Sequence, residues 1–259
     1  MAHSGQQAWL ESSVCGARPQ AAALHLLDRF ELFCAGRPVP LSLSAQRLVA
    51  FVALRGPIAR TLAAGTLWPE GTDEHAQASL RTAMWRANRM VSGLLVTERA
   101  GILLAPSVSV DSRDLAHRVG DMLRPMITSD QRSTNHFGWL RTGDLLPGWY
   151  DDWVVIEQER LRQLKLHGLE ASARRLAADG RYGEALELAF EAVRLEPLRE
   201  SAHRAVIDAL LAEGNVSDAL GHYRRFCAQL AAELGVAPSA RLVAVMRRAV
   251  PALADVQAS

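Results

Sequence analysis

Long hydrophobic runs and cysteine are both scarce in this chain. No apolar run approaches the roughly 18 residues that a membrane helix needs, and the first 19 residues lack the apolar core of a secretory signal. Cys15, Cys34 and Cys227 are far apart and form no CxxC pair, which argues against a disulfide framework and a zinc site. These absences predict a cytoplasmic protein that makes no use of a membrane.

The motifs of common enzyme classes are missing as well. The sequence contains no HExxH, GxSxG or GxGxxG pattern, and its single lysine, Lys165, is not placed as in a phosphate-binding loop. The eight histidines lack metal-ligand spacing, and the adjacent acids Asp151 and Asp152 would point apart on a helix. We therefore expect no enzyme, no cofactor and no metal.

Charge of one sign is not in excess. The chain has 29 Lys and Arg against 28 Asp and Glu, so its net charge is +1 and any basic surface must be local. With 259 residues, 49% of them hydrophobic, the chain can bury the core of one large domain or of two small ones. We expect two domains.

The first half of the chain predicts strands, then helices, then a hairpin. Residues 24–43 contain short apolar stretches around a turn at 36–38, which is typical of strands. Helical spacing follows at 45–54, 59–67 and about 73–91, with Ser44 and Asp73 as predicted N-caps of the first and third helices. Residues 94–106 then read as a hairpin. This order is that of a winged helix-turn-helix.

The third predicted helix, which contains SLRTAMWRANRM, has two different faces. At about 100° per residue its apolar residues gather on one side, whereas the other side is basic, lacks acids and carries a tryptophan. The second helix of a helix-turn-helix enters the major groove, so this face predicts DNA contacts. The residues expected nearest the bases are Thr82, Trp85 and Arg89, and those nearer phosphates are Ser79, Arg81 and Arg86. The alternatives are an ordinary solvated face and a Trp85 packed against the hairpin.

Further phosphate contacts are expected beside this helix. Arg60 and Thr61 open the preceding helix, whose N-terminal amides favour an anion. Arg99 lies in the hairpin turn and is the candidate contact of the wing. The alternative for Arg60 and Arg99 is that they are ordinary surface residues without a DNA contact.

The second half contains an internal repeat. Residues 178–186 align with residues 212–220, so that Gly180 is matched with Gly214 and Ala185 with Ala219 at one common offset. This offset equals the tetratricopeptide period of about 34 residues. We therefore predict a mainly α protein with a small β component, made of a flexible segment (1–22), a winged-helix DNA-binding domain (23–114) and an all-α tetratricopeptide-like domain (115–259) with a loop or linker at 127–137.

The chain resembles the Streptomyces antibiotic regulatory protein family, in which an OmpR-like winged helix precedes a bacterial transcriptional activation domain. The motifs that carry the resemblance are Leu67-Trp68-Pro69, Ala76-x-x-Ser79-Leu80-Arg81, Trp153, Glu159-Arg160-Leu161-Arg162, Glu196-Pro197-Leu198-Arg199-Glu200, Ala219-Leu220-x-x-Tyr223 and Glu233-Leu234-Gly235-Val236-x-Pro238-Ser239. One departure is Asn88, which stands where a leucine is usual.

The resemblance implies a transcription activator. It would bind direct repeats of double-stranded promoter DNA as a tandem dimer and recruit RNA polymerase through its sigma factor. The residues alone support only a groove-reading helix, a wing and a helical interaction domain. The alternative is an adaptor that binds proteins through its repeats and whose winged helix has only a structural role.

Overall fold

The structure, a computed structural model, describes residues 22–99, 101–124 and 137–250. Contacts between Cα atoms divide the chain into two units, one of residues 1–116 and 142–161 and the other of residues 117–141 and 162–259. Within the described part, no helix is both long enough and apolar enough to cross a membrane.

The first unit contains a small sheet whose strands come from both ends of the predicted winged helix. The strands are β1 (Ala22–His25), β2 (Glu31–Cys34), β3 (Arg37–Pro38) and β6 (Val108–Val110), in the order β3-β2-β1-β6. The pairs β1-β2 and β2-β3 are antiparallel, as expected of strands joined by a tight turn. The parallel pairing of β6 with β1 was not predicted, because it joins segments that lie far apart in the sequence.

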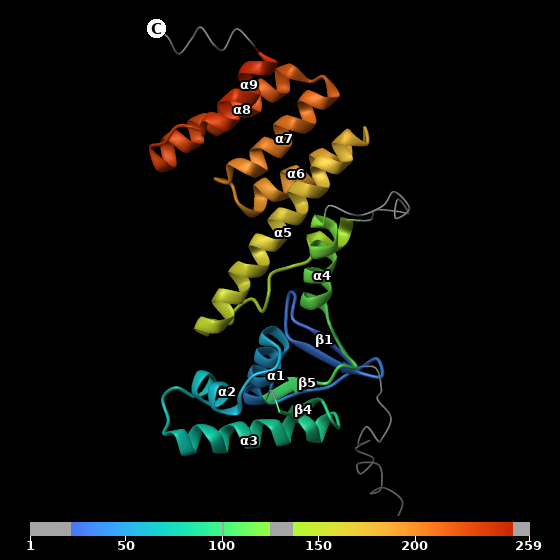
Figure 1. Ribbon diagram of the computed structural model, residues 1–259, viewed down its shortest axis with the longest axis vertical. Helices are drawn as coiled ribbons and strands as arrows, with labels where there is room; N and C mark the ends of the chain where they lie inside the picture. The colour runs from blue at the N-terminus through green and yellow to red at the C-terminus, as the bar shows by residue number, and fades with distance from the viewer. Residues whose placement is uncertain (1–21, 100, 125–136, 251–259) are drawn as a thin grey trace, which may run out of the picture. The chain divides into compact units, whose positions relative to one another are not determined.

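Three helices follow β3, as predicted. They are α1 (Leu43–Arg55), α2 (Arg60–Leu67) and α3 (Asp73–Met90) (Figure 1). Both N-cap predictions are wrong by one or two positions: α1 is preceded by Ser42, and α3 by Thr72, whose Oγ1 accepts a hydrogen bond from the His75 amide at 3.3 Å. Asp73 instead lies in the first turn, where a carboxylate is favoured by the helix dipole.

The first unit also includes a segment that lies far along the sequence. The amides of Asp28 and Leu146 donate to the carbonyls of Asp144 and Leu26 at 2.9 and 2.8 Å, and Trp153 packs edge-on against Phe51 at 5.0 Å between ring centroids. These contacts group residues 142–161 with the first unit, although the sequence pattern counts them in the second domain. The predicted domain boundaries themselves stay a prediction.

Helices account for nearly all of the remaining described chain. They are α4 (Asp111–Leu123), a 3-10 helix (Phe137–Arg141), α5 (Asp152–Ala178), α6 (Tyr182–Leu195), α7 (Glu200–Glu213), α8 (Val216–Leu234) and α9 (Ala240–Ala249) (Figure 1). The predicted fold class, mainly α with a small β component, is confirmed.

The predicted repeat is visible in the second unit. Helices α6 and α8 begin one repeat apart, at Tyr182 and Val216, and each follows a glycine with positive φ, 77° at Gly180 and 93° at Gly214. Glycine adopts this conformation without the steric cost of a Cβ. Ala185 and Ala219 are both fully buried, as expected where paired helices approach closely.

Two predicted segments lie almost wholly outside the described residues. Of the segment 1–22, only Ala22 is described, and it is a buried residue of β1. Of the predicted linker 127–137, only Phe137 is described, and it is a buried residue of the 3-10 helix.

Two histidines of the second unit form a buried pair. The Nδ1 of His203 lies 3.0 Å from Nε2 of His222, and the Nε2 of His203 lies 2.8 Å from the carbonyl oxygen of Pro197. Because a carbonyl can only accept, His203 carries its proton on Nε2 and accepts on Nδ1 from His222. Burial lowers the pKa of both rings, that of His222 to about 4. The pair is therefore neutral and has a structural role within the second unit.

Candidate nucleic-acid interface

Helix α3 has the two faces that its sequence predicts. Ala76, Leu80, Ala83 and Ala87 are buried against the rest of the first unit, and Met84 is half-buried. The helix is thus held by an apolar stripe of mostly small side chains, which lets its backbone lie close to its neighbours α1 and α2.

The opposite face of α3 is open. Arg81, Thr82, Trp85, Arg86 and Arg89 are exposed and Ser79 is half-buried. Trp85 is 59% exposed, and the guanidinium carbon of Arg89 lies 5.1 Å from its ring centroid. This geometry is a cation-π contact on the surface of the helix. Trp85 is therefore not part of the core, the alternative that the sequence left open.

Three arginines give this face its charge. Among the residues that the structure describes, Arg81, Arg86 and Arg89 take part in no ion pair, and the acids of α3 are confined to Asp73 and Glu74 in its first turn. Their positive field is uncompensated along the last three turns of the helix, which is the arrangement that attracts a polyanion.

Thr82 uses its hydroxyl within the helix. Its Oγ1 donates to the carbonyl of Ala78 at 3.0 Å, so the proton of this hydroxyl is already engaged. What remains for a ligand is the methyl group and an oxygen that can accept, and a threonine methyl can contact the thymine methyl in the major groove.

Helix α2 brings a second set of predicted residues beside α3. Arg60, Thr61 and Arg81 line one cavity of about 770 Å³ between the two helices, together with Gln77. The helix begins after Ala59, which supplies no side-chain cap to the first amides. Asp73 and Glu74 also line the cavity and reduce its positive potential.

The wing is the hairpin of β4 (Leu95–Glu98) and β5 (Gly101–Leu104), with Arg99 exposed in its turn. The amides of Ile58 and Ile102 donate to each other's carbonyls at 2.9 and 2.8 Å, so β5 is tied to the residues just before α2. Gly101 has φ +121°, and a Cβ there would lie 2.0 Å from the Ile58 carbonyl oxygen. Only glycine permits this close approach.

Sequence reasoning missed one residue at this interface. The side-chain amide of Asn88 forms two hydrogen bonds with the backbone of Leu95, each of 2.8 Å. The only signal in the sequence was the presence of asparagine where the resemblance predicts leucine.

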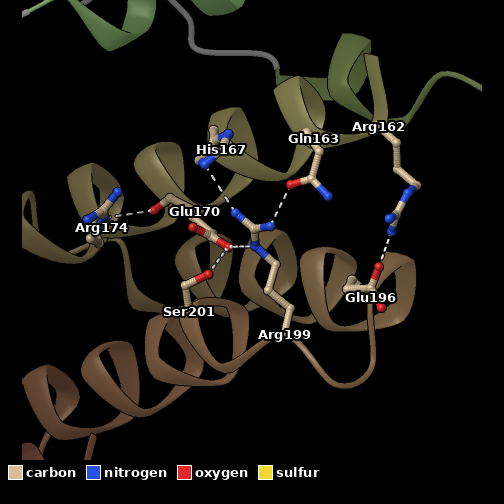
Figure 2. A network of polar contacts seen from close by, with 8 residues as sticks. All are labelled: Arg162, Gln163, His167, Glu170, Arg174, Glu196, Arg199 and Ser201. Carbon is tan, nitrogen blue, oxygen red and sulfur yellow. Dashed lines mark hydrogen bonds and ion pairs between the residues drawn. The ribbon is translucent and has the colours of Figure 1, made fainter. Parts of the chain in front are cut away.

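A polar network in the second unit explains several motifs of the resemblance. Arg199 donates to Glu170 at 2.6 Å and to Gln163 at 2.7 Å, and its Nη2 lies 3.2 Å from Nε2 of His167, as Figure 2 shows. The three partners lie on one face of α5, and Ser201 donates to the same Glu170 oxygen at 2.7 Å.

The neighbouring motif residues pair in the same region. Arg162 pairs with Glu196 in Figure 2, and the backbone amide of Ser239 donates to Glu200 at 2.7 Å. Four motif residues thus contact one another in two pairs, Arg162 with Glu196 and Glu200 with Ser239, and Arg199 links the start of α7 to α5. Their role in the structure is to hold this unit together.

Comparisons with known proteins agree with this architecture. Residues 140–249 match the family model described as Bacterial transcriptional activator domain. The chain is similar to the structure of Mycobacterium tuberculosis EmbR in complex with a low affinity phosphopeptide, with a TM-score of 0.61 and 20% identity. That match covers 90% of this chain and 65% of the EmbR chain. No curated protein matches the chain significantly.

The likeness to EmbR shows the fold, and the family match shows the kind of second domain. Families of this kind regulate transcription and are not enzyme families. The chain therefore carries a bacterial transcriptional activator domain at residues 140–249, behind a unit with the strand and helix order of a winged helix.

Proposed function

We propose that this regulator binds double-stranded promoter DNA through the outer face of α3. The observation that carries the proposal is the open, acid-free face of α3, the second helix of the helix-turn-helix. This face has an exposed Trp85 and three arginines without an acidic partner among the described residues. Such a face fits the major groove in size and charge.

Each candidate residue has a proposed role. Thr82, Trp85 and Arg89 are nearest the bases, where the stacked Arg89 offers a planar guanidinium to guanine and Thr82 offers its methyl group. The remaining residues contact phosphates, with Ser79, Arg81 and Arg86 on α3, Arg60 and Thr61 at the start of α2, and Arg99 in the wing.

Substituting Arg86→Ala or Arg89→Ala is expected to weaken DNA binding by about 1 to 3 kcal/mol, because each change removes a base contact or a strong phosphate contact. Fluorescence anisotropy would measure this on a duplex selected from a random pool by the wild-type protein. The matched control is Arg37→Ala, which removes the same charge from an exposed position on β3.

The control variant should bind as the wild type does. If both α3 variants also keep their affinity at low salt, α3 is not the recognition helix. If the wild-type protein selects no duplex at all, the adaptor that binds proteins through the tetratricopeptide-like unit takes the place of this proposal.

We also propose that the regulator activates transcription in the cytoplasm. It would bind direct repeats near a promoter as a tandem dimer and recruit RNA polymerase through the sigma factor. The match of residues 140–249 to an activator domain supports this step. Recruitment of the polymerase adds a second binding free energy, coupled to that of DNA binding. Mutations can therefore change recruitment and DNA affinity separately.

In a purified transcription assay, the wild-type protein is expected to raise the transcript yield from a promoter that carries its selected site. Glu70→Ala changes an exposed acid outside the α3 face and the wing and is expected to lower this yield without changing DNA affinity. A wild-type protein that binds the site tightly but leaves the yield at the protein-free level would instead be a repressor or an architectural protein.

A further inference from the structure

Both edges of the wing hairpin are held by the helix-turn-helix. The β5 edge is paired through Ile102 with Ile58, directly before α2. The β4 edge is held from the other side by a side chain of α3, that of Asn88. The wing therefore does not depend on its own two strands alone, which would be marginally stable.

The contact at the β4 edge has the geometry of a strand pairing. Asn88 Nδ2 donates to the carbonyl of Leu95, and the amide of Leu95 donates to Asn88 Oδ1, each at 2.8 Å. Within the hairpin, the carbonyl of Leu94 already accepts from the amide of Ala105 at 2.9 Å. Since successive residues of an antiparallel strand point their polar groups to alternate sides, those of Leu95 face away from β5. The Asn88 amide thus occupies the place of a neighbouring strand.

Two hydrogen bonds from one planar amide fix the orientation of the Leu95 backbone relative to α3, as well as its distance from the helix. Asn88 lies between buried Ala87 and exposed Arg89, so it is anchored on the same turn that presents the arginine. A leucine at this position could fill the space but could neither donate nor accept, and the polar groups of Leu95, a residue only 2% exposed, would lose this partner.

We infer that Asn88 is a positioning residue that couples the recognition helix to the wing, so that Arg89 and Arg99 engage one DNA duplex at the same time. The inference rests on the proposed DNA binding. Once α3 is docked, a wing held in place meets the phosphate backbone without a further loss of orientational freedom, whereas a loosened wing must be ordered on binding.

A double-mutant cycle between Asn88→Ala and Arg99→Ala tests the coupling in the full-length protein on its selected duplex. Arg99→Ala is expected to weaken binding about tenfold in the wild-type background and less than about threefold in the Asn88→Ala background. Asn88→Ala alone is also expected to lower the slope of log affinity against log salt by about 1, as Arg99→Ala does, because one phosphate contact is lost. A purely structural role would change affinity without this loss of slope.

The inference is overturned if Arg99→Ala costs the same factor in both backgrounds, or if it costs nothing in the wild type. In the latter case the losses with Arg86→Ala and Arg89→Ala still decide the proposed function separately. Circular dichroism checks that Asn88→Ala is folded. If it is not, Asn88→Leu replaces it in the same cycle, because it removes both hydrogen bonds while keeping an apolar residue of similar size.

Discussion

Arg199→Met is expected to lower the free energy of unfolding by about 3 to 5 kcal/mol, because it leaves Glu170 as a buried charge without its cation. The side chains of Glu170 and Arg199 are 7% and 18% exposed, and the ion pair is 2.6 Å long. Ser201 would remain as a donor to Glu170, but a hydroxyl does not neutralise the carboxylate. Urea unfolding of the full-length protein, followed by circular dichroism, measures the loss.

A double variant separates the effect of the lost ion pair on stability from the effect of lost packing. Glu170→Leu combined with Arg199→Met removes both charges and is expected to recover most of the stability, since apolar replacement of a buried pair is often neutral. Arg141→Ala is the control, because its ion pair with Glu187 is exposed at both ends and should contribute at most about 1 kcal/mol. An Arg199→Met protein as stable as the Arg141→Ala protein would show that the network does not hold α5 and α7 together.

Gly143→Ala is expected to destabilise the first unit by about 1 to 3 kcal/mol through overpacking. A Cβ at this position would lie 1.4 Å from Oδ1 of Asp28. The backbone of Asp28 is held, with a φ of 70° and its amide donating to the carbonyl of Asp144 at 2.9 Å, so its carboxylate must rotate away from the new Cβ. The change should weaken the contact of residues 142–146 with residues 26–28, which follow β1. The loss of stability is measured as a lower midpoint of urea unfolding.

The matched control for this prediction is Gly183→Ala in α6. No atom lies within 4 Å of a Cβ built there, and alanine favours the helix over glycine by about 1 kcal/mol. The control should therefore be as stable as the wild type or slightly more stable. Wild-type stability in the Gly143→Ala protein would mean that the segment after residue 141 is not tied to the first unit in this way.

The periodic elements of this protein could be predicted from the sequence. The two faces of α3 follow from apolar residues spaced three and four apart, and Ala185 and Ala219 are both buried because they occupy the same position of the internal repeat. In both cases the signal is local, since neighbouring residues on a helix share a face whatever the rest of the chain does. The exposed arginines of α3 could be named for the same reason.

Contacts between distant residues could not be predicted. The sequence shows that Asn88 is unusual, but not that its amide would meet the open edge of β4, because that depends on the tight turn after α3. The pairing of β6 with β1 gave no signal either, since a strand as short as β6 cannot show a period.

Local patterning along the chain determined which segments are helices, which faces they bury and which arginines they expose. The tertiary structure alone decided that residues 142–161 return to the first unit, that Arg199 meets three side chains of α5 and that Asn88 holds the wing. The physical reason is that periodicity reports burial, whereas a hydrogen bond or ion pair depends on which distant groups the fold brings within about 3 Å of each other.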